Sequence, residues 1–486
     1  MRGRSLPLSF ARDSRRLLLP MLLVMSLAGG WLLTGCRSGK PRPSILLIVI
    51  DTLRADHVGL LSPGGPAATP NLDRRFRSGT AFRNAGTPAP FTMPAVASLL
   101  TGVYPDRTGV VAHEAGTSLA TWTGPTLAEH AVRAGLATAA VVANPWLARR
   151  NTGFDRGFEK FSRFTISGRR GGSGDADSVT DEAIRHLDGF GDRPFLLWVH
   201  YFDPHMPYEP PADFAAAAGA APGTNRVVDD FLRPRRNLRK IYSGQGYAEP
   251  ELEQTRRLYA GEVRFVDAQV ERLLSVLDSR GLTENTLVVV ASDHGEGLGE
   301  HGLYFAHDYT LYEELTRVAL MLRGPGVPPG SRDDPVSLLD VEPTLCRLAK
   351  LDCTVDPDGR DLFSTPTERT LFAAATASRV RKSATFDRLT VAGLDGRWTM
   401  ARRGNLKRIR IPTPKGEVHE TYDLASDPLE SEDLSADAHG DAQDLGSELS
   451  AWSRRMNALR PAASDQLDPR EQERANETLR SLGYLQ

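Results

Sequence analysis

Residues 44–51 read Ser-Ile-Leu-Leu-Ile-Val-Ile-Asp, an apolar run that ends in a carboxylate. A short, continuous apolar run is typical of a strand that is buried on both faces of a parallel sheet. A second apolar run, Thr286–Ala291, leads through Ser292 to Asp293 and His294. Ligands and metals bind at the carboxyl ends of the strands in an open α/β sheet. The two runs therefore predict an α/β fold with metal-type side chains at one edge of its sheet.

Further apolar runs alternate with amphipathic stretches along residues 44–351. This alternation favours right-handed crossovers, and so it predicts a mostly parallel central sheet with helices on both faces. The predicted strands are Ser44–Ile50, Leu136–Ala143, Phe195–Tyr201, Thr286–Ala291 and Val318–Leu322. The predicted helices are Thr126–Ala134, Val179–Leu187, Glu251–Leu277 and Leu338–Leu351.

After about Phe363 the strand-like segments become short and are separated by turns, which predicts a smaller α+β subdomain with an antiparallel sheet. We expect a surface loop at the acidic residues 427–444 and a last helix at Glu471–Leu482. The predicted strands here are Thr370–Ala375, Arg388–Ala392, Arg397–Ala401 and Lys407–Ile411. The predicted domains are 1–36 (signal segment), 37–43 (tether), 44–365 (catalytic domain), 366–460 (C-terminal subdomain) and 461–486 (tail with a helix).

The N-terminus has the pattern of a targeting segment. Arginines precede the apolar run Leu17–Leu33, which leads to Thr34-Gly35-Cys36. This pattern resembles a bacterial lipoprotein signal, in which Cys36 would carry the lipid after cleavage. The alternative is one membrane-spanning anchor, because the run is close to the about 20 residues that a span needs. We expect a lipid-anchored protein of the bacterial cell envelope, on the periplasmic side or at the cell surface.

Charge and cysteine content limit the classes of function further. The formal net charge of −2 argues against nucleic acid as a partner. Apart from Cys36, the chain has two cysteines, Cys346 and Cys353, seven residues apart. On one continuous helix they would share a face. A disulfide in an oxidising compartment and two buried thiols both agree with this spacing.

Asp51 and Thr92 each allow two interpretations. A carboxylate directly after a buried strand is costly unless it is paired or bound to a metal, but Asp51 could also cap a helix. Thr92 comes just before a helix that is predicted to begin near Met93 and Pro94, so it could be an N-cap. The same position would place its hydroxyl at the positive end of the helix dipole, where an alkoxide is stabilised.

Asp293 and His294 form the most informative pair in the chain. A carboxylate and an imidazole suit zinc or manganese, whereas calcium prefers more oxygen ligands; the alternative is an ordinary turn at a strand end. Five of the eleven histidines lie in the stretch after Asp293, at the end of the predicted strand Phe195–Tyr201 or in the loop after that strand, which indicates a site. They are His200, His205, His294, His301 and His307.

Taken together, the segments around Asp51, Thr92, His205 and Asp293 resemble the sulfatase branch of the alkaline phosphatase superfamily. The resemblance runs from about Ser44 to Leu351 and returns at Thr421–Glu430. Familiar sulfatases carry a cysteine or serine, converted to formylglycine, in a Cys-x-Pro-Ser-Arg pattern. Here the first position of that pattern is Thr92 and the last is Val96. The substitution resembles superfamily members that use a threonine nucleophile, such as phosphoethanolamine transferases and nucleotide phosphodiesterases.

The resemblance implies a role for each candidate residue. It implies that Thr92 is the nucleophile and that His205 and His307 are catalytic residues on the substrate side or at a second metal. His200, Asp203 and His301 are expected to contact substrate. The implied cofactor is a divalent metal, namely zinc, calcium or manganese, with one or two ions bound. The implied ligands of one ion are Asp51, Thr92, Asp293 and His294.

The resulting hypothesis is a metal-dependent hydrolase or transferase of phosphate, phosphodiester or sulfate esters. The expected partners are a small-molecule, glycan or lipid ester as substrate, and a membrane reached through the lipid anchor. One alternative is a sulfatase proper, and the other is a catalytically inactive lipoprotein that keeps the fold as a binding surface. Retention of all the implied ligand types favours an enzyme.

Overall fold

The computed structural model covers most of the chain between Arg42 and Pro461. The predicted signal segment 1–36 with Cys36, the predicted strand Arg388–Ala392 and the predicted helix Glu471–Leu482 lie outside the described residues. Within the described ranges, no helix is both long enough and apolar enough to cross a bilayer. The structure describes residues 42–66, 68–112, 118–164, 174–233, 240–241, 243–307, 310–353, 356–364, 368–376, 397–413, 416–437 and 440–461.

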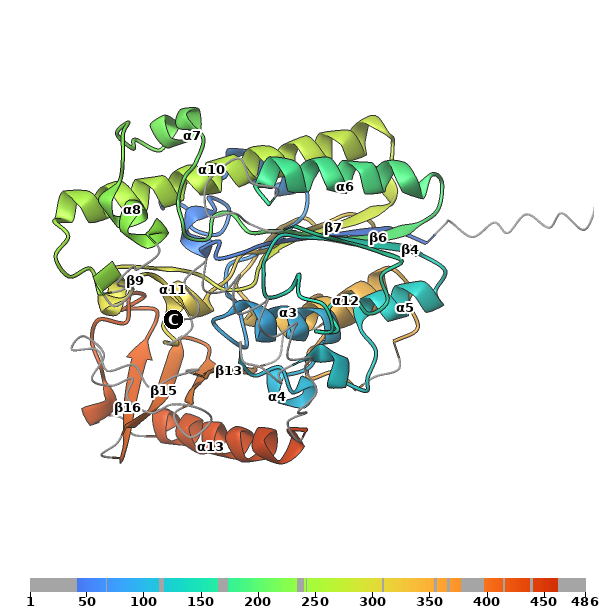
Figure 1. The fold of residues 1–486 in the computed structure, drawn as a ribbon. Coiled ribbons are helices and arrows are strands. Elements are labelled where there is room, and N and C mark those ends of the chain that lie inside the picture. The colour runs from blue at the N-terminus through green and yellow to red at the C-terminus, as the bar shows by residue number, and fades with distance from the viewer. Residues whose placement is uncertain are drawn as a thin grey trace, which may run out of the picture. The chain divides into compact units, whose positions relative to one another are not determined.

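An eight-stranded sheet forms the centre of the structure, in the order β11-β2-β10-β7-β1-β6-β4-β5 (Figure 1). The predicted fold class is confirmed, with a parallel core and an antiparallel β10 that makes the sheet mixed. Its strands are β1 (Ser44–Ile50), β2 (Thr80–Phe82), β4 (Ala137–Val142), β5 (Lys160–Arg163), β6 (Phe195–Tyr201), β7 (Thr286–Ser292), β10 (Leu320–Arg323) and β11 (Gly330–Arg332). Two small sheets pair β3 (Ala85–Gly86) with β12 (Val336–Ser337) and β8 (Gly297–Leu298) with β9 (Tyr304–Ala306).

The register of the three central strands aligns their carboxyl ends. Ile50 at the end of β1 lies opposite Tyr201 of β6 and Ser292 of β7. The residues that follow these strands therefore leave the sheet at the same level. This alignment places Asp51 and Asp293 side by side, although they are far apart in the sequence.

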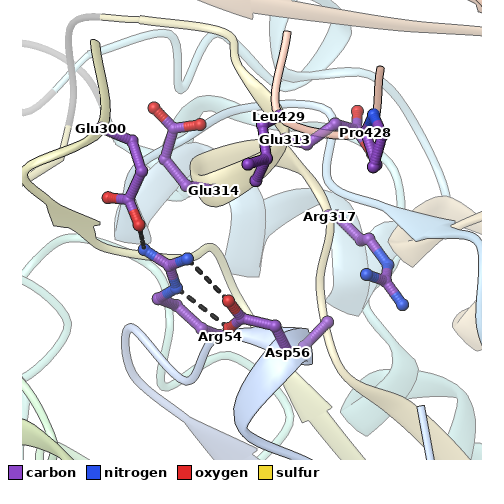
Figure 2. A pocket seen from close by; sticks show the side chains of 9 residues that line it. Arg54, Asp56, Glu300, Glu313, Glu314, Arg317, Pro428 and Leu429 are labelled. Carbon is purple, nitrogen blue, oxygen red and sulfur yellow. Dashed lines mark hydrogen bonds and ion pairs between the residues drawn. The ribbon is translucent and has the colours of Figure 1, made fainter. Parts of the chain in front are cut away.

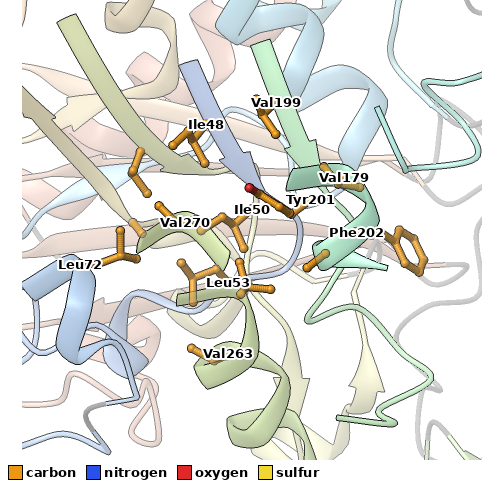
Figure 3. Packing of buried hydrophobic residues seen from close by; sticks show 14 of the residues in the cluster. Ile48, Ile50, Leu53, Leu72, Val179, Val199, Tyr201, Phe202, Val263 and Val270 are labelled. Carbon is orange, nitrogen blue, oxygen red and sulfur yellow. The ribbon is translucent and has the colours of Figure 1, made fainter. Parts of the chain in front are cut away.

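Helices cover both faces of the sheet. Even-numbered residues of β1, such as Ile48 and Ile50, pack in a cluster with Val179 of α6 and with Val263 and Val270 of α10 (Figure 3). Odd-numbered β1 residues pack with α3, α5 and α12 on the other face. Each buried aliphatic side chain contributes about 1.5–3 kcal/mol. The helices are α2 (Pro70–Phe76), α3 (Thr92–Thr101), α4 (Pro105–Thr108), α5 (Leu127–Arg133), α6 (Ala176–Phe190), α7 (Ala212–Ala217), α8 (Arg226–Leu232), α10 (Glu249–Ser279), α11 (Glu313–Thr316), α12 (Val341–Leu348) and α13 (Asp441–Leu459).

The helix predicted at Leu338–Leu351 is shorter than expected. A 3-10 turn comes first, and α12 then ends at Leu348. Lys350, with φ of 56°, has a left-handed conformation that breaks the helix. Cys353 therefore lies beyond the helix and not on its face. It nevertheless forms a disulfide with Cys346, with a Cα–Cα distance of 6.0 Å, which settles the alternative that the sequence leaves open.

A separate antiparallel sheet lies C-terminal to the large one, as predicted. Two elements of this C-terminal region, the strand β16 and the helix α13, are missing from the sequence prediction. The strand β16 carries polar residues along much of its length, and α13 begins inside the acidic stretch that we expected to be a loop. Acidic residues favour a helix N-terminus, and α13 packs Leu445, Leu449 and Trp452 into a buried cluster. The strands are β13 (Thr370–Ala375), β14 (Trp398–Arg403), β15 (Leu406–Thr413) and β16 (Gly416–Asp423).

Candidate active site

Five of the predicted site residues meet at the carboxyl edge of the central strands. Asp51 follows β1, His200 lies in β6, and Asp293 and His294 follow β7. Thr92 is the first residue of α3. All five side chains are buried. Ligand atoms of Asp51, His200 and Asp293 lie within 4.8 Å of one another, so the structure adds His200 to the carboxylates.

The Thr92 hydroxyl points to this cluster and does not cap its helix. Its Oγ1 lies 3.4 Å from Nε2 of His294. It also accepts a hydrogen bond of 3.3 Å from Nδ2 of Asn144. The capping position of α3 is Phe91, and no side chain caps this helix. The geometry thus gives the hydroxyl a place in the site and gives no support to the N-cap interpretation.

Asn144 is a site residue that the sequence interpretation missed. It is buried just after β4 and donates from Nδ2 to Oδ2 of Asp51 at 2.6 Å, as well as to Thr92. Its Oδ1 accepts a hydrogen bond of 2.9 Å from the amide of Trp146, which fixes the orientation of the side chain. The signal was available, because Asn144 directly follows a predicted strand, as Asp51 does.

The donor atoms of the cluster fit a divalent cation. Oδ1 of Asp51, Oδ2 of Asp293 and both ring nitrogens of His200 are buried and have no hydrogen-bond partner among the described residues. Burial and the neighbouring Asp293 carboxylate raise the pKa of Asp51 well above its usual range. A bound cation would coordinate the unpartnered donor atoms and would offset the repulsion and burial of the two carboxylates.

His294 is oriented as a metal-binding histidine is. Its Nδ1 donates to the carbonyl of Gly295 at 2.9 Å, which places the lone pair on Nε2. That nitrogen lies 3.7 Å from Oδ1 of Asp51 and 3.5 Å from Oδ2 of Asp293. Oxygen and nitrogen donors in this combination suit zinc or manganese better than calcium.

Two more histidines stand beside the cluster. The ring centroid of His307 lies 4.4 Å from that of His294 and 5.0 Å from that of His205. Nδ1 of His307 donates to Oε1 of Glu296 at 3.1 Å, while Nδ1 of His205 donates to a backbone carbonyl at 2.7 Å. Burial and His307 lower the pKa of His205 well below its usual value. His205 is therefore a neutral imidazole at neutral pH.

Glu296 is a second residue that the sequence interpretation missed, and it gives a testable prediction. Its carboxylate holds His307, and its other oxygen accepts from the Tyr208 hydroxyl at 3.0 Å. Glu296→Gln keeps the size of the side chain but removes the charge that orients His307. We expect kcat/KM to fall by about 10–100-fold with the fold intact. Steady-state kinetics measure this, with the exposed Glu284→Gln as control; unchanged kinetics in Glu296→Gln would contradict the assignment.

The structure does not bring His301 to the cluster. Nδ1 of His301 lies 2.9 Å from Oε1 of Glu314, and Nε2 lies 3.1 Å from the carbonyl of Glu430. Its ring stacks on Tyr312 at 3.6 Å. Against the effect of burial, Glu314 raises the pKa of His301 to about 9. These contacts tie its loop to the C-terminal segment, so we do not assign it to substrate. Asp203 is half-buried two residues after β6, in the turn that leads to His205.

A pocket of about 110 Å³ is lined by Arg54 and by residues of other segments, but by none of the five clustered residues (Figure 2). Arg54, three residues after Asp51, donates to both oxygens of Asp56 and to Glu300 at 2.8 Å. Arg54 also donates to the carbonyl of Glu296 at 3.0 Å, which links the pocket to the histidines. The arginine charge is therefore already paired within the pocket. The lining residues are Arg54, Ala55, Asp56, Glu300, Glu313, Glu314, Arg317, Pro428 and Leu429.

Comparisons with known proteins agree with this architecture. The profile of the sulfatase family matches residues 43–351. Choline-sulfatase of Rhizobium meliloti (strain 1021) is 30% identical over 362 residues, which span 63% of this chain and 68% of the relative. The multifunctional alkaline phosphatase superfamily protein PehA of Trinickia caryophylli is 26% identical over 367 residues, which span 59% of this chain and 69% of the relative. The solved phosphonate monoester hydrolase of Agrobacterium radiobacter has a TM-score of 0.66 at 21% identity, covering 86% of this chain and 95% of that one. Because the family profile covers more than half of its residues, the chain belongs to the sulfatase family.

Proposed function

We propose that the chain is a metal-dependent hydrolase of phosphodiesters or phosphonate monoesters that uses Thr92 as its nucleophile. The observation that carries this proposal is the position of the Thr92 hydroxyl, buried between Asn144 and His294 beside two carboxylates. Proteins similar to this chain include both a choline-sulfatase and a phosphonate monoester hydrolase. Family membership alone therefore leaves sulfur and phosphorus esters open, and the nucleophile favours phosphorus.

Asp51, Asp293 and His294 would hold one divalent cation, with Thr92 and His200 next to it. When bound, such a cation supplies Lewis-acid chemistry that lowers the pKa of a neighbouring hydroxyl. Hydrogen bonds orient two of these ligands. Asn144 donates to Asp51, and His294 donates to the carbonyl of Gly295.

The chain's own groups then account for the other requirements of the reaction. The Asn144 amide orients Oγ1 of Thr92, and the N-terminus of α3 stabilises negative charge on this oxygen. Oε1 of Glu296 lies 3.1 Å from Nδ1 of His307 and orients this ring, and we assign His307 to protonation of the leaving alcohol. His205, which is neutral, is assigned to the non-bridging oxygens of the substrate.

Threonine chemistry decides between sulfur and phosphorus. A formylglycine hydrate can release sulfate by elimination, because the aldehyde is regenerated. A threonine ester has no such route, so it must be cleaved by attack of water at the central atom. In-line displacement at phosphorus with metal support suits this second step.

A substrate panel tests the preferred ester. We expect the purified chain, loaded with zinc or manganese, to show higher kcat/KM on aryl phosphodiesters and phosphonate monoesters than on aryl sulfates. Initial rates on matched p-nitrophenyl esters measure this without a change of leaving group. A higher kcat/KM on the sulfate would leave the family assignment intact, overturn the phosphorus preference and favour a sulfatase proper. A lack of turnover on every ester would favour the inactive binding protein.

We also propose that the chain is anchored to the bacterial envelope through a lipid on Cys36. Support for this comes from the apolar run Leu17–Leu33 and from Thr34-Gly35-Cys36, which resemble a lipoprotein signal. Mass spectrometry of the mature protein is expected to find an N-terminal, diacylated Cys36, and Cys36→Ala is expected to release or mislocalise the chain. A membrane-bound protein that still begins at Met1 would support the spanning anchor in place of the lipid.

A further inference from the structure

A second cluster of metal-type side chains lies on other elements than the active site. His130 in α5 and Glu342 in α12 are both buried, and Cys353 follows α12. Ligand atoms of these three residues lie within 4.8 Å of one another. Sγ of Cys346, which shares the disulfide with Cys353, lies 3.1 Å from Oε1 of Glu342. Three residues of the kinds that bind zinc thus lie together, and Cys346 lies beside two of them.

His130 is held in the orientation that a metal ligand needs. Its Nδ1 donates to the carbonyl of Asp352 at 3.0 Å, which places the lone pair on Nε2. Nε2 is buried and has no hydrogen-bond partner in the part of the chain that the structure describes. It lies 3.6 Å from Oε1 of Glu342, beyond hydrogen-bond distance. Both ring nitrogens of a buried histidine normally have hydrogen-bond partners, so the unpartnered Nε2 of His130 calls for a ligand.

Glu342 likewise has no compensating cation close to it among the described residues. Burial raises the pKa of its carboxyl to about 8, and no cationic side chain within the described ranges offsets this effect. His130 cannot supply the charge, because burial lowers its pKa below the usual value. A buried carboxyl and a neutral imidazole that face each other without a bond are a costly arrangement. A divalent cation between them would satisfy both.

We propose that the chain, when its disulfide is reduced, binds one Zn²⁺ through His130, Glu342, Cys346 and Cys353. Cys346 and Cys353 are then joined either by the disulfide bond or by the zinc ion. An external dithiol gives two electrons and two protons to the Cys346–Cys353 disulfide and becomes a disulfide itself. The two new thiols lose their protons as their sulfurs bind zinc.

The ligand atoms need to move only a short way for zinc to replace the disulfide. Zinc–ligand bonds of about 2.0–2.3 Å place the ligand atoms of a tetrahedral site about 3.3–3.8 Å apart. The ligand atoms of His130, Glu342 and Cys353 already lie within 4.8 Å of one another, and Sγ of Cys346 lies 3.1 Å from Oε1 of Glu342. Two reduced sulfur atoms move apart on their own, since they are no longer bonded. The disulfide links Cys353 to Cys346 of α12, whereas the zinc ion would also link it to His130 of α5.

Cobalt uptake by the full chain tests the proposal. Co²⁺ replaces Zn²⁺ in thiolate sites and gives a sulfur-to-cobalt charge-transfer absorption. We expect the chain reduced with a phosphine, which supplies no thiol ligand, to bind one more Co²⁺ than the oxidised chain and to show this absorption. Cys353→Ser is expected to remove both signals. His130→Gln is expected to weaken the extra binding by at least about tenfold while the disulfide still forms in the oxidised chain.

Asp293→Ala keeps this test separate from the proposed function. In this variant the active-site metal is expected to be lost, while the additional, reduction-dependent equivalent and its absorption remain. The proposal is overturned if the reduced chain binds no more cobalt than the oxidised chain, if the cobalt spectrum lacks thiolate absorption, or if reduction unfolds the chain in circular dichroism.

Discussion

Thr92→Ala is expected to lower kcat by at least about a thousandfold while the fold and the metal content are largely retained. The reason is that Thr92 offers its hydroxyl to the buried cluster and does not cap α3. If the hydroxyl only capped the helix, the substitution would cost about 1 kcal/mol of stability and leave the rate nearly unchanged. Kinetics, thermal unfolding and metal analysis of the same preparation separate the two cases.

Thr92→Ser is the matched variant for this experiment. Serine keeps the oxygen that Asn144 holds, so measurable turnover is expected to remain. The contrast between the serine and alanine variants shows whether the oxygen itself is needed. A well-folded Thr92→Ala protein that hydrolyses substrate at the parent rate would remove Thr92 from the mechanism.

Asp293→Ala is expected to abolish both metal binding and turnover. Its Oδ2 is one of the unpartnered atoms of the cluster, and its Oδ1 accepts from the amides of Thr52 and His294 at 3.3 and 2.9 Å. The substitution therefore removes a ligand and loosens a second one. Metal analysis after dialysis is expected to fall from one equivalent or more to near zero. Asp333→Ala is the control, because this exposed carboxylate pairs with Arg83 at the surface.

The double variant Asp51→Ala, Asp293→Ala gives the strictest form of the same test. Neither carboxylate remains near His200 and His294, so no divalent cation should be held there. Full metal occupancy in a folded double variant would show that the active-site metal lies elsewhere.

The sequence predicts the centre of the fold well because the signal there is local. The strands β1 and β6 are buried on both faces, so their continuous apolar runs define their bounds. A parallel sheet then brings the carboxyl ends together, which is why Asp51 and Asp293 could be placed at one edge without a structure. The start of α3 is also predicted from local residues, because Met93 and Pro94 mark the beginning of a helix.

Contacts between distant segments were harder to predict. Asn144 hydrogen-bonds to Asp51, and Glu296 accepts a hydrogen bond from His307. Individual hydrogen bonds of this kind leave no periodic pattern in the sequence. His301 was grouped with the site because it follows His294 closely. The chain turns between them, and the ring of His301 contacts Glu314 in place of the cluster. Proximity in sequence is therefore a weak guide within a loop.

The same limit explains the errors at the C-terminus. The strand β16 has polar residues at its exposed positions, and its partner β15 is needed to define it. The acidic stretch that begins α13 is polar when taken alone, although the helix buries Trp452 and Met456 one turn apart further along. Both elements depend on the surface against which they pack.

The stereochemical course at phosphorus reports whether a covalent intermediate forms on Thr92. Each in-line displacement inverts the configuration at phosphorus. A chiral phosphorothioate diester, hydrolysed in isotopically labelled water, shows whether one or two displacements occur. We expect net retention, from attack by Thr92 followed by attack by water. Net inversion would mean that water attacks the substrate directly, and it would contradict a threonine nucleophile.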